Sequence, residues 1–413
     1  MEEKKKSPEL RFAGYKEDWN EAELGLLAEF TKGQGYSKND LKAAGTPIIL
    51  YGRLYTNYQT VIEEVDTYAI PQENSFYSAG GEVIVPASGE TQEDIVRASV
   101  VTKTGVILGG DLNIIKPNEL INSNFLALTI SNGKVYQELV KKAQGKSVVH
   151  IRNNDLKEAI IPYPIKDEQQ QIDYFFKNID ELITKHQKKH NRLVTLKKSM
   201  LEKMFPNEMQ TVPEIRFKGF EGDWESDELN NFGNTYTGLS GKTKKDFGHG
   251  DAEYITYMNV FSNPIANPSL TDSVEIDNSQ NCVEYGDVLF TVSSETPEEV
   301  GFSSVWTQKE KNIYLNSFCF GYRPTKRFDL TFLANAFRSN AFRKKITLLA
   351  QGISRFNISK TKAMNLELSF PDYDEQVKIG LYFKDLEGLI SSHKKQLQKL
   401  NNFKQSLSEK MFV

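Results

Sequence analysis

The sequence has few cysteines and no long hydrophobic run. Its 413 residues include only Cys282 and Cys319, both in the second half, which argues against a disulfide framework and favours a reducing, cytoplasmic environment. No stretch approaches the roughly 20 apolar residues that a membrane helix requires. The charged start MEEKKKSPEL has no apolar run behind it, as a signal peptide would have. We therefore expect a cytoplasmic protein without a membrane partner.

The sequence also lacks the motifs of common catalytic sites. GLSGKT, from Gly238, resembles the end of a phosphate-binding loop, but Tyr236 stands where that pattern needs glycine. NPSL, from Asn267, lacks the aromatic residue of an adenine methyltransferase tetrapeptide, and no glycine-rich cofactor turn accompanies it. Five scattered histidines and two cysteines form no zinc motif, and no carboxylate–lysine nuclease core is visible. The sequence thus predicts no catalytic residue, metal or cofactor in this chain.

Charge and size leave nucleic-acid binding open. The net charge of −4 counts against a protein that grips nucleic acid alone, although local basic patches are enough to read a sequence. It suggests that partner subunits supply much of the phosphate neutralisation. The length allows two or three domains, each with its own core.

An internal repeat organises the whole chain. PELRFAGYKEDWNEAEL, from Pro8, aligns with PEIRFKGFEGDWESDEL, from Pro213, and nine of the seventeen positions are identical. The same offset of 205 residues aligns GEVIVPASGET with GDVLFTVSSET. At an offset of 207, AQG, DEQ and the endings LEKMF and SEKMF also coincide. The sequence therefore predicts a tandem duplication.

The two copies diverge unevenly. The stretch from Lys32 to Gly80 has almost no similarity to the stretch from Gly238 to Tyr285, whereas the domain entries and helical ends stay alike. This pattern indicates one scaffold that carries two different specificities.

Each copy ends in a long amphipathic segment. After Pro164 the chain runs without proline or glycine to Phe205, about 40 residues or roughly 60 Å of helix. Apolar residues recur in heptads from Ile172 and Phe175, and in the second copy from Ile379 and Tyr382. Such a helix is too long for a globular core, and it occurs once in each repeat. The simplest expectation is that the two helices pair with each other.

Polar residues inside the heptads suggest how the helices pair. In one antiparallel register His186 faces Gln396 and Lys189 faces His393, which places the polar residues in two central layers. The same register sets Leu182 on Leu400, Leu193 on Leu389 and Leu196 on Leu386. We expect an antiparallel intramolecular coiled coil with the globular domains at opposite ends. His186 and His393 are interpreted as register-setting residues; a pH switch or metal site is the alternative.

Short β-rich runs alternate with helical stretches in each globular part. TPIILYGRLYT, GEVIVPA, GVILGG and NIIKP read as strands in the first copy, and NSNFLALTISNGKVYQELVKKA reads as a helix. In the second copy GDVLFTV and NSFCFGYRP correspond to strands, and DLTFLANAFRSNAFRKKITLLAQ to the helix. The predicted fold is mixed α/β with pseudo-two-fold symmetry. Its segments are globular domains at 1–165 and 207–371 and long helices at 166–206 and 372–413.

These motifs, in this order and in both copies, resemble the specificity (S) subunit of Type I restriction-modification systems. The resemblance rests on P-E-[LI]-R-F-x-G, G-[ED]-V with S-x-E-T after it, A-Q-G, D-E-Q and E-K-M-F. It implies two target-recognition domains, each reading half of a bipartite site on double-stranded DNA, with the paired helices as a ruler. It also implies two methyltransferase (M) and two restriction-translocation (R) subunits as partners, in association with the bacterial or archaeal nucleoid. S-adenosylmethionine, ATP and magnesium are then expected on those partners.

Base reading needs exposed donors and acceptors, with basic groups around them. In the first domain the candidates are Lys38, Arg53, Tyr55, Asn57, Tyr58, Lys146, Ser147 and His150. In the second domain they are Lys242, Lys244, Lys245, Tyr257, Asn259, Ser354, Arg355 and Asn357. Some of these could be solvated loop residues, and Tyr55 and Tyr257 could equally pack on a sheet. The S-x-E-T loops occur in both domains, which favours loop shaping or helix capping over base reading.

Two rival functions remain. A fused methyltransferase–specificity enzyme would need an added cofactor domain, for which the two repeats leave no room. An independent DNA-binding or scaffold protein would act without partners. DNA binding by the chain alone, compared with binding in the presence of M subunits, would distinguish the latter from a specificity subunit.

Overall fold

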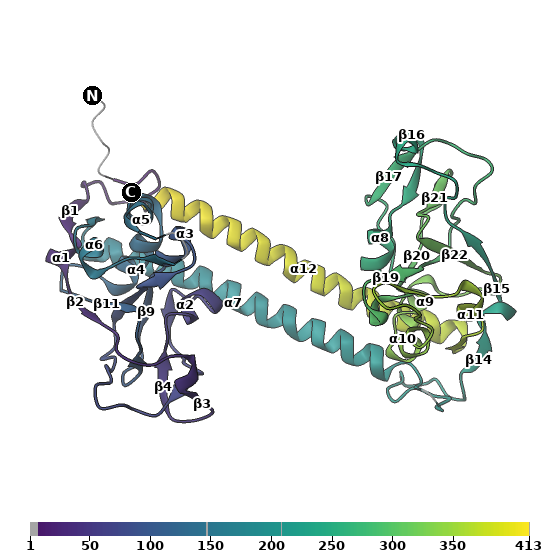
Figure 1. The fold of residues 1–413 in the computed structure, drawn as a ribbon, viewed down its shortest axis with the longest axis horizontal. Helices are drawn as coiled ribbons and strands as arrows, with labels where there is room; N and C mark the ends of the chain where they lie inside the picture. The colour runs from purple at the N-terminus through teal and green to yellow at the C-terminus, as the bar shows by residue number, and fades with distance from the viewer. Residues whose placement is uncertain (1–6, 146–147, 208, 413) are drawn as a thin grey trace. The chain divides into compact units, whose positions relative to one another are not determined.

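The computed structural model describes residues 7–145, 148–207 and 209–412. The chain divides into two compact units, one formed by Met1–His186 with Gln396–Val413 and the other by Gln187–Lys395. Each unit therefore joins a globular domain to one half of each of two long helices, α7 (Lys166–Lys203) and α12 (Tyr373–Met411) (Figure 1). No helix in the described part of the chain is long and apolar enough to cross a membrane.

The first unit contains a five-stranded sheet in the order β2-β11-β7-β9-β5 and a four-stranded sheet in the order β10-β4-β6-β3. Two short pairs, β1-β13 and β12-β8, complete it. The strands are β1 (Asn20–Glu23), β2 (Ala28–Lys32), β3 (Leu41–Lys42), β4 (Thr46–Ile49), β5 (Val61–Ile62), β6 (Tyr68–Ala69), β7 (Glu82–Pro86), β8 (Ser88–Gly89), β9 (Ser99–Val101), β10 (Ile107–Leu108), β11 (Leu112–Pro117), β12 (Val149–His150) and β13 (Ile160–Tyr163). The helices are α1 (Leu24–Leu27), the 3₁₀ turn η1 (Lys38–Asp40), α2 (Arg53–Thr56), α3 (Gln92–Ile95), α4 (Ser123–Ser131), α5 (Gly133–Lys142) and α6 (Asn153–Lys157).

The second unit contains a four-stranded sheet in the order β15-β22-β18-β20 and a three-stranded sheet β17-β16-β21. The pairs β14-β24 and β19-β23 complete it. The strands are β14 (Glu225–Glu228), β15 (Gly233–Thr237), β16 (Phe247–Ile255), β17 (Thr271–Val274), β18 (Val288–Thr291), β19 (Ser293–Ser294), β20 (Ser303–Val305), β21 (Ile313–Leu315), β22 (Cys319–Pro324), β23 (Phe356–Asn357) and β24 (Glu367–Phe370). The helical segments are η2 (Leu229–Asn231), η3 (Lys244–Asp246), α8 (Tyr257–Ser262), η4 (Pro297–Glu299), α9 (Leu330–Ala336), α10 (Asn340–Thr347) and α11 (Lys360–Met364).

The main sheets of the two units follow the same plan. The order β2-β11-β7-β9 in the first unit matches β15-β22-β18-β20 in the second, and the neighbouring pairs of these four strands are antiparallel in both units. The central strand reads EVIVP in one copy and VLFT in the other, and each is buried along its whole length. The predicted duplication and the mixed α/β fold are confirmed.

Two predictions of local structure were wrong. TPIILYGRLYT is not one strand, because strand β4 ends at Ile49 and the short helix α2 begins at Arg53. Each predicted long domain helix is two helices, α4 with α5 and α9 with α10. Asn132, in an extended conformation, separates α4 from α5, which begins at Gly133 with φ +64°, and the Ser339 side chain caps the start of α10. These breaks let the second helix of each pair change direction.

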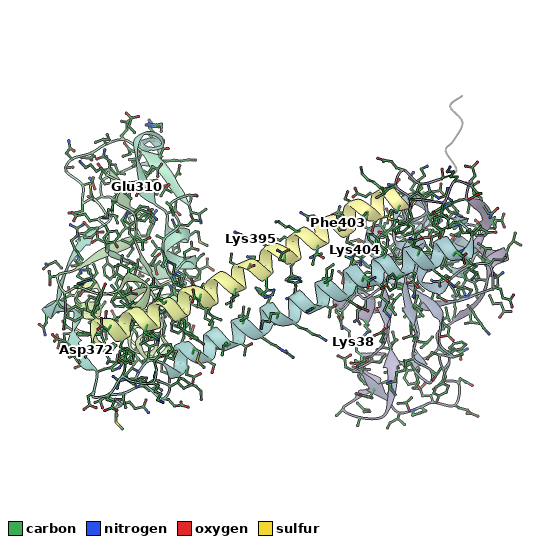
Figure 2. All side chains as sticks on the ribbon, turned by 180° about the vertical axis from the view of Figure 1, so that it is seen from behind. Lys38, Glu310, Asp372, Lys395, Phe403 and Lys404 are labelled. Atoms are coloured by element: carbon green, nitrogen blue, oxygen red, sulfur yellow. The ribbon has the colours of Figure 1, made fainter. Side chains whose placement is uncertain are left out.

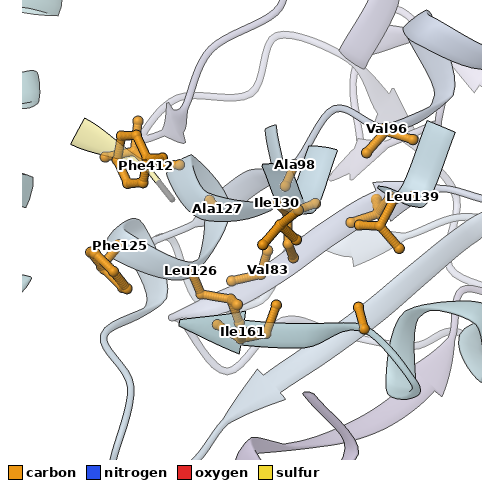
Figure 3. Packing of buried hydrophobic residues seen from close by; sticks show 14 of the residues in the cluster. Val83, Val96, Ala98, Phe125, Leu126, Ala127, Ile130, Leu139, Ile161 and Phe412 are labelled. Carbon is orange, nitrogen blue, oxygen red and sulfur yellow. The ribbon is translucent and has the colours of Figure 1, made fainter. Parts of the chain in front are cut away.

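The long helices complete the core of each unit. In the first unit Ile172 and Phe176 of α7 join Leu407 and Met411 of α12, and Phe412 packs 5.6 Å from the Phe176 ring. Figure 3 shows Phe412 near Phe125 of α4 in the same core. In the second unit Phe205, just beyond α7, lies 6.0 Å from Phe383 of α12. The motif ending E-K-M-F therefore closes a core in both units.

The shared entry motifs form a buried ion pair in each unit. Arg11 donates two hydrogen bonds to Glu168 at 2.7 and 2.8 Å, and Arg216 donates two to Glu375 at 2.8 Å each. The side chains of Glu168 and Glu375 are 0% and 1% exposed. The arginine of P-E-[LI]-R-F and the glutamate of D-E-Q thus tie each domain entry to the start of its long helix.

Within each unit the two helix halves run antiparallel. In the first unit Asp180 pairs with Lys404 at 2.5 Å while Phe176 meets Phe412, so residue numbers fall along α7 as they rise along α12. In the second unit Lys197 pairs with Glu387 at 2.5 Å while Phe205 meets Phe383. The antiparallel orientation is confirmed.

The predicted contact face of the helices was half wrong. One half of the heptad positions is buried as expected, including Ile172, Ile179 and Leu193. The positions three residues later face away: Leu182, Leu196, Leu389 and Phe403 are 40% to 51% exposed, and Lys189 and Gln396 are exposed as well. The buried positions are instead one residue further along, at Phe176, Phe383, Leu397 and Met411.

The pairs Leu182–Leu400 and Leu193–Leu389 therefore do not form core layers, nor do His186–Gln396 and Lys189–His393. Phe175 and Phe176 could each continue the apolar helix face that begins at Ile172. Packing of the globular core determines which of the two is buried. Phe176 enters that core, whereas Phe175 packs 5.4 Å from Phe12 of the domain entry. In the second unit Phe383 enters the core and Tyr382 packs 5.9 Å from Phe217.

Candidate nucleic-acid interface

Two shared motifs meet in each unit. In the first, β8 of the S-x-E-T motif pairs with β12, which follows the A-Q-G turn, and His150 lies opposite Ser88. In the second, β19 pairs with β23, and Asn357 lies opposite Ser293. Residues far apart in the sequence thus build the same small two-stranded frame twice.

The A-Q-G turn closes each frame. Gln144 and His150 exchange backbone hydrogen bonds of 3.0 and 2.8 Å, and Gln351 and Asn357 exchange two of 2.9 Å. The following glycines have φ +143° at Gly145 and +145° at Gly352. A Cβ at Gly352 would lie 2.0 Å from the Arg355 carbonyl oxygen. Only glycine therefore suits this position in both copies.

A tyrosine from the divergent stretch holds each frame. The Tyr55 hydroxyl donates to the Ser88 carbonyl at 2.7 Å, and the Tyr257 hydroxyl donates to the Ser293 carbonyl at 2.6 Å. Burial raises the pKa of Tyr55 and of Tyr257 above the ordinary value, so both remain hydrogen-bond donors at neutral pH. Base reading and packing on a sheet were the two interpretations of these residues, and the bonds of both hydroxyls to strand carbonyls favour packing.

Each frame presents a different exposed polar side chain. His150 is exposed, and its Nδ1 lies 3.1 Å from the Ser88 hydroxyl oxygen. Asn357 is exposed at the equivalent place in the second unit. An imidazole and a carboxamide on matching frames have different donor and acceptor patterns, which is what reading two different base sequences requires.

The S-x-E-T loops also shape local structure. The Thr91 hydroxyl accepts from the Asp94 backbone N–H at 3.0 Å and so caps α3. The Ser294 hydroxyl donates to the Thr296 carbonyl. The predicted capping role is confirmed at the first motif. In the second motif Thr296 precedes η4 without a side-chain capping bond, so only the loop-shaping role is seen there.

Several predicted candidates lie near the frames or on exposed turns. Tyr55, Asn57, His150, Tyr257, Ser354, Arg355 and Asn357 belong to the two frames or to the segments beside them, and Lys38, Lys244 and Lys245 are exposed on 3₁₀ turns (Figure 2 labels Lys38). Lys146 and Ser147 lie outside the described residues.

Other candidates have partners within the fold. Asn259 is 1% exposed and donates to the carbonyls of Asn267 and Leu270, so its prediction as a base reader is wrong. The Arg53 guanidinium binds Asp66 at 2.6 Å, and Lys242 binds Asp277 at 2.7 Å. The Tyr58 hydroxyl donates to the Ala98 carbonyl at 3.2 Å.

The structure also reveals a likeness that the sequence comparison missed. Ser37 with Asp40, and Thr243 with Asp246, form the same capping box around η1 and η3, each with a backbone N–H to carboxylate bond of 2.6 Å. Lys38 and Lys244 therefore occupy equivalent first positions of matching turns. The short pattern [ST]-K-x-D in both divergent stretches could have indicated it.

Known proteins share both sequence and fold with this chain. A model of the Type I restriction modification DNA specificity domain matches residues 16–195 and 221–402. The chain is 26% identical over 202 residues to the putative type I restriction enzyme MjaX specificity subunit of Methanocaldococcus jannaschii; the match covers 46% of this chain and spans about half, 46%, of that curated relative.

Two solved structures have a similar fold. The Type I restriction-modification S subunit from M. genitalium has a TM-score of 0.56 at 15% identity, over 98% of this chain and 99% of that one. A chain from a study of complex assembly and conformational transition of the type I R-M system has a TM-score of 0.55 at 15% identity, over 94% and 96%. Since the domain model matches both repeats, this chain belongs to the family of Type I restriction-modification specificity subunits.

Proposed function

We propose that this chain is the non-catalytic DNA-recognition subunit of a Type I restriction-modification complex. Each globular unit reads one half of a bipartite, asymmetric target in the major groove of double-stranded DNA. The observation that carries this proposal is the pair of matching frames that present His150 in one unit and Asn357 in the other. One scaffold with two different exposed side chains suits two different half-sites.

The paired helices serve as a ruler between the two readers. Readers of one DNA face must stay at a fixed separation, related to the helical repeat of DNA. Long helices that pack antiparallel in each unit hold such a distance better than a loop does.

Partner subunits then carry out the methylation and restriction reactions. Two M subunits carrying S-adenosylmethionine methylate the target, and two R subunits use ATP and magnesium. Among the described residues no group of three or more histidine, cysteine, aspartate or glutamate side chains could hold a metal ion. The exposed outer faces of the D-E-Q helix starts, including Tyr174 at 70% and Leu381 at 53% exposure, are suitable docking surfaces for the M subunits.

Mapping methylated adenines in cells that express the chain with its M subunit tests this function. We expect a split motif with two unlike halves, which disappears when this chain is deleted. A continuous or palindromic motif, or methylation that persists after deletion, would contradict the proposal.

Purified components separate the two rival functions. The chain alone with S-adenosylmethionine should not methylate DNA, whereas measurable activity would support a fused enzyme. Tight, specific DNA binding by the chain without M subunits would instead support an independent DNA-binding protein.

A further inference from the structure

The middle of each long helix carries charge of one sign only. On α7 the segment from Leu182 to Leu201 includes six lysine or arginine residues and no aspartate or glutamate. On α12 the segment from Gly388 to Ser408 includes four lysines and again no acidic residue. The net charge of the chain is −4, so these two basic segments contribute +10 and all other residues together −14. The helices are therefore the basic part of a chain that is acidic elsewhere.

Most of these cations have no acidic partner within the fold. Lys197 pairs with Glu387 and Lys404 pairs with Asp180, and both carboxylates lie outside the basic segments. The other eight are exposed and form no ion pair with any residue that the structure describes: Lys185, Lys188, Lys189, Arg192, Lys198, Lys394, Lys395 and Lys399. Eight exposed charges of one sign thus remain available to a partner.

Four of the exposed cations form a single stripe on α7. They stand at positions i, i+3, i+4 and i+7, which share one face of a helix: Lys185, Lys188, Lys189 and Arg192. The repeat keeps half of this stripe on α12, where Lys395 corresponds to Lys188 and Lys399 to Arg192 (Figure 2 labels Lys395). The stripe on α7 extends over about 10 Å of helix.

Pairing between the helices does not explain the charges. The ion pair within each unit fixes which residues of α7 and α12 are level with one another. In that register Lys189 is level with Lys395 in the second unit, and Lys185 is level with Lys399 in the first. Charged positions that flank the contact of two paired helices usually bring opposite signs together, whereas here lysine is level with lysine. This arrangement costs stability in the chain alone and is relieved by a bound anion.

Duplex DNA has the charge density that this surface requires. It carries about one negative charge per 1.7 Å of its axis, and lysine and arginine bind its phosphates whatever the base sequence. In a split target the spacer between the half-sites is not read through its bases, but its phosphates are present. A contact made only by exposed cations suits that part of the DNA.

We propose that the stripe of Lys185, Lys188, Lys189 and Arg192, with Lys395 and Lys399 of α12, binds the phosphates of the spacer DNA. The inference rests on the proposed function, since a spacer exists only in a split target. The helices then hold the DNA as well as setting the distance between its two readers. Part of the phosphate neutralisation, which the net charge assigns to partner subunits, comes from this chain itself.

Removal of the stripe charges tests the proposal in the complex with M subunits. One variant combines Lys185→Gln, Lys188→Gln, Lys189→Gln and Arg192→Gln, because glutamine favours the helix nearly as well as lysine. The matched control combines Lys185→Arg, Lys188→Arg and Lys189→Arg, which keeps every charge. The probes are a duplex with the mapped methylation motif and an unrelated duplex of equal length.

The salt dependence of binding is the quantity to measure. Each lost phosphate contact lowers the slope of log K against log salt concentration by about 0.9, so the glutamine variant should lose about 2–4 from the slope on both duplexes. The arginine control should keep the wild-type slope. Since the stripe reads no bases, the methylated motif and its spacer length should not change in either variant.

Neutral phosphate analogues locate the contact on the DNA. Methylphosphonate linkages in the spacer should weaken binding of the wild-type complex about tenfold and that of the glutamine variant by less than about twofold. The same linkages outside both half-sites are the control and should affect the two complexes alike.

A second variant covers the case in which the four-residue variant fails to fold, which circular dichroism would reveal. Lys395→Gln combined with Lys399→Gln removes the equivalent charges of α12, and the slope should fall by about 1–2.

A wild-type salt dependence in the folded glutamine variants would overturn the inference. So would equal sensitivity of wild type and variant to methylphosphonates in the spacer. Loss of an M subunit in native mass spectrometry, with an unchanged salt dependence, would assign the stripe to an acidic protein surface and would overturn it too. A wild-type complex that methylates no split motif would instead refute the proposed function, and the inference with it.

Discussion

The side chains at positions 150 and 357 differ on frames that are otherwise alike. Ser88 and Ser293 occupy equivalent strand positions. The carbonyl of each accepts a hydrogen bond from a tyrosine hydroxyl, that of Tyr55 in the first unit and that of Tyr257 in the second. A difference in specificity between the units is therefore expected to depend on the side chains that these frames present.

Exchange of these side chains is the most direct test at the residue scale. We expect His150→Asn to change or relax base preference at one position of one half-site, with discrimination altered by about 1–3 kcal/mol. The other half-site, read by the unchanged second unit, serves as the internal control. Sequencing of methylated sites in cells measures the effect; equal changes in both halves would show that His150 does not read bases.

The buried arginine–glutamate pairs concern stability. Arg216→Met leaves Glu375 buried without its partner, which should cost about 3–5 kcal/mol of unfolding free energy. Glu214→Gln is the control, because its ion pair with Lys203 is exposed and should contribute less than about 1 kcal/mol. Urea unfolding measures both. Equal effects of the two variants would contradict a structural role for the entry motif that the two repeats share.

Single-residue prediction failed where a partner lies far away in the sequence. Asn259 and Arg53 have the side chains that base reading requires, and both lie in the divergent stretches. Asn259 instead donates hydrogen bonds to the carbonyls of Asn267 and Leu270, and Arg53 forms an ion pair with Asp66. Residue type indicates what a side chain can bind, whereas only the folded chain decides whether that capacity is already used.

At the scale of elements, the A-Q-G turn depends on its glycine. Gly352→Ala places a Cβ against the Arg355 carbonyl at a left-handed φ, so the turn must distort. We expect about 1–3 kcal/mol of destabilisation and weaker DNA binding at one half-site.

Gly388→Ala in α12 is the matched control. Its Cβ would meet nothing within 4 Å, and the helix interior should gain about 0.5–1 kcal/mol. Differential scanning calorimetry compares the two variants. A Gly352→Ala chain as stable as Gly388→Ala would exclude a conformational requirement for glycine at the turn.

The long helices show how far periodicity predicts an element. Length and position followed from the heptads and the repeat, because these depend on the helix alone. The antiparallel orientation was also predicted correctly, although Lys189 and Gln396 of the polar layers from which it was argued are exposed. The contact face did not, since Leu182 and Ile183, or Leu389 and Ile390, satisfy the pattern equally well. The choice falls to the ends of the helices, where Phe176 and Phe383 enter the globular cores. The alternatives Leu182 and Leu196 on α7, and Leu389 and Phe403 on α12, remain exposed.

At the scale of the whole chain, the duplication separates what must be common from what may vary. The Arg–Glu pairs, the glycine turns and the E-K-M-F endings recur because each closes the same structure in either unit. The arginines at 338 and 343, where the first unit has Ser131 and Tyr136, show that the copies have also diverged away from the two frames.

The proposed ruler makes a prediction that only the whole chain can test. Insertion of one heptad between His186 and Gln187, and another between Lys395 and Gln396, keeps the buried face of both helices in phase. Seven residues lengthen a helix by about 10 Å, so the methylated motif should keep both half-sites while its spacer grows by about three base pairs. The same insertion in α7 alone shifts this helix by seven residues relative to α12. The antiparallel contacts then cannot form on both sides of the insertion, and methylation should be lost. If the doubly extended chain instead methylates with an unchanged spacer, the helices do not set the distance between the two readers.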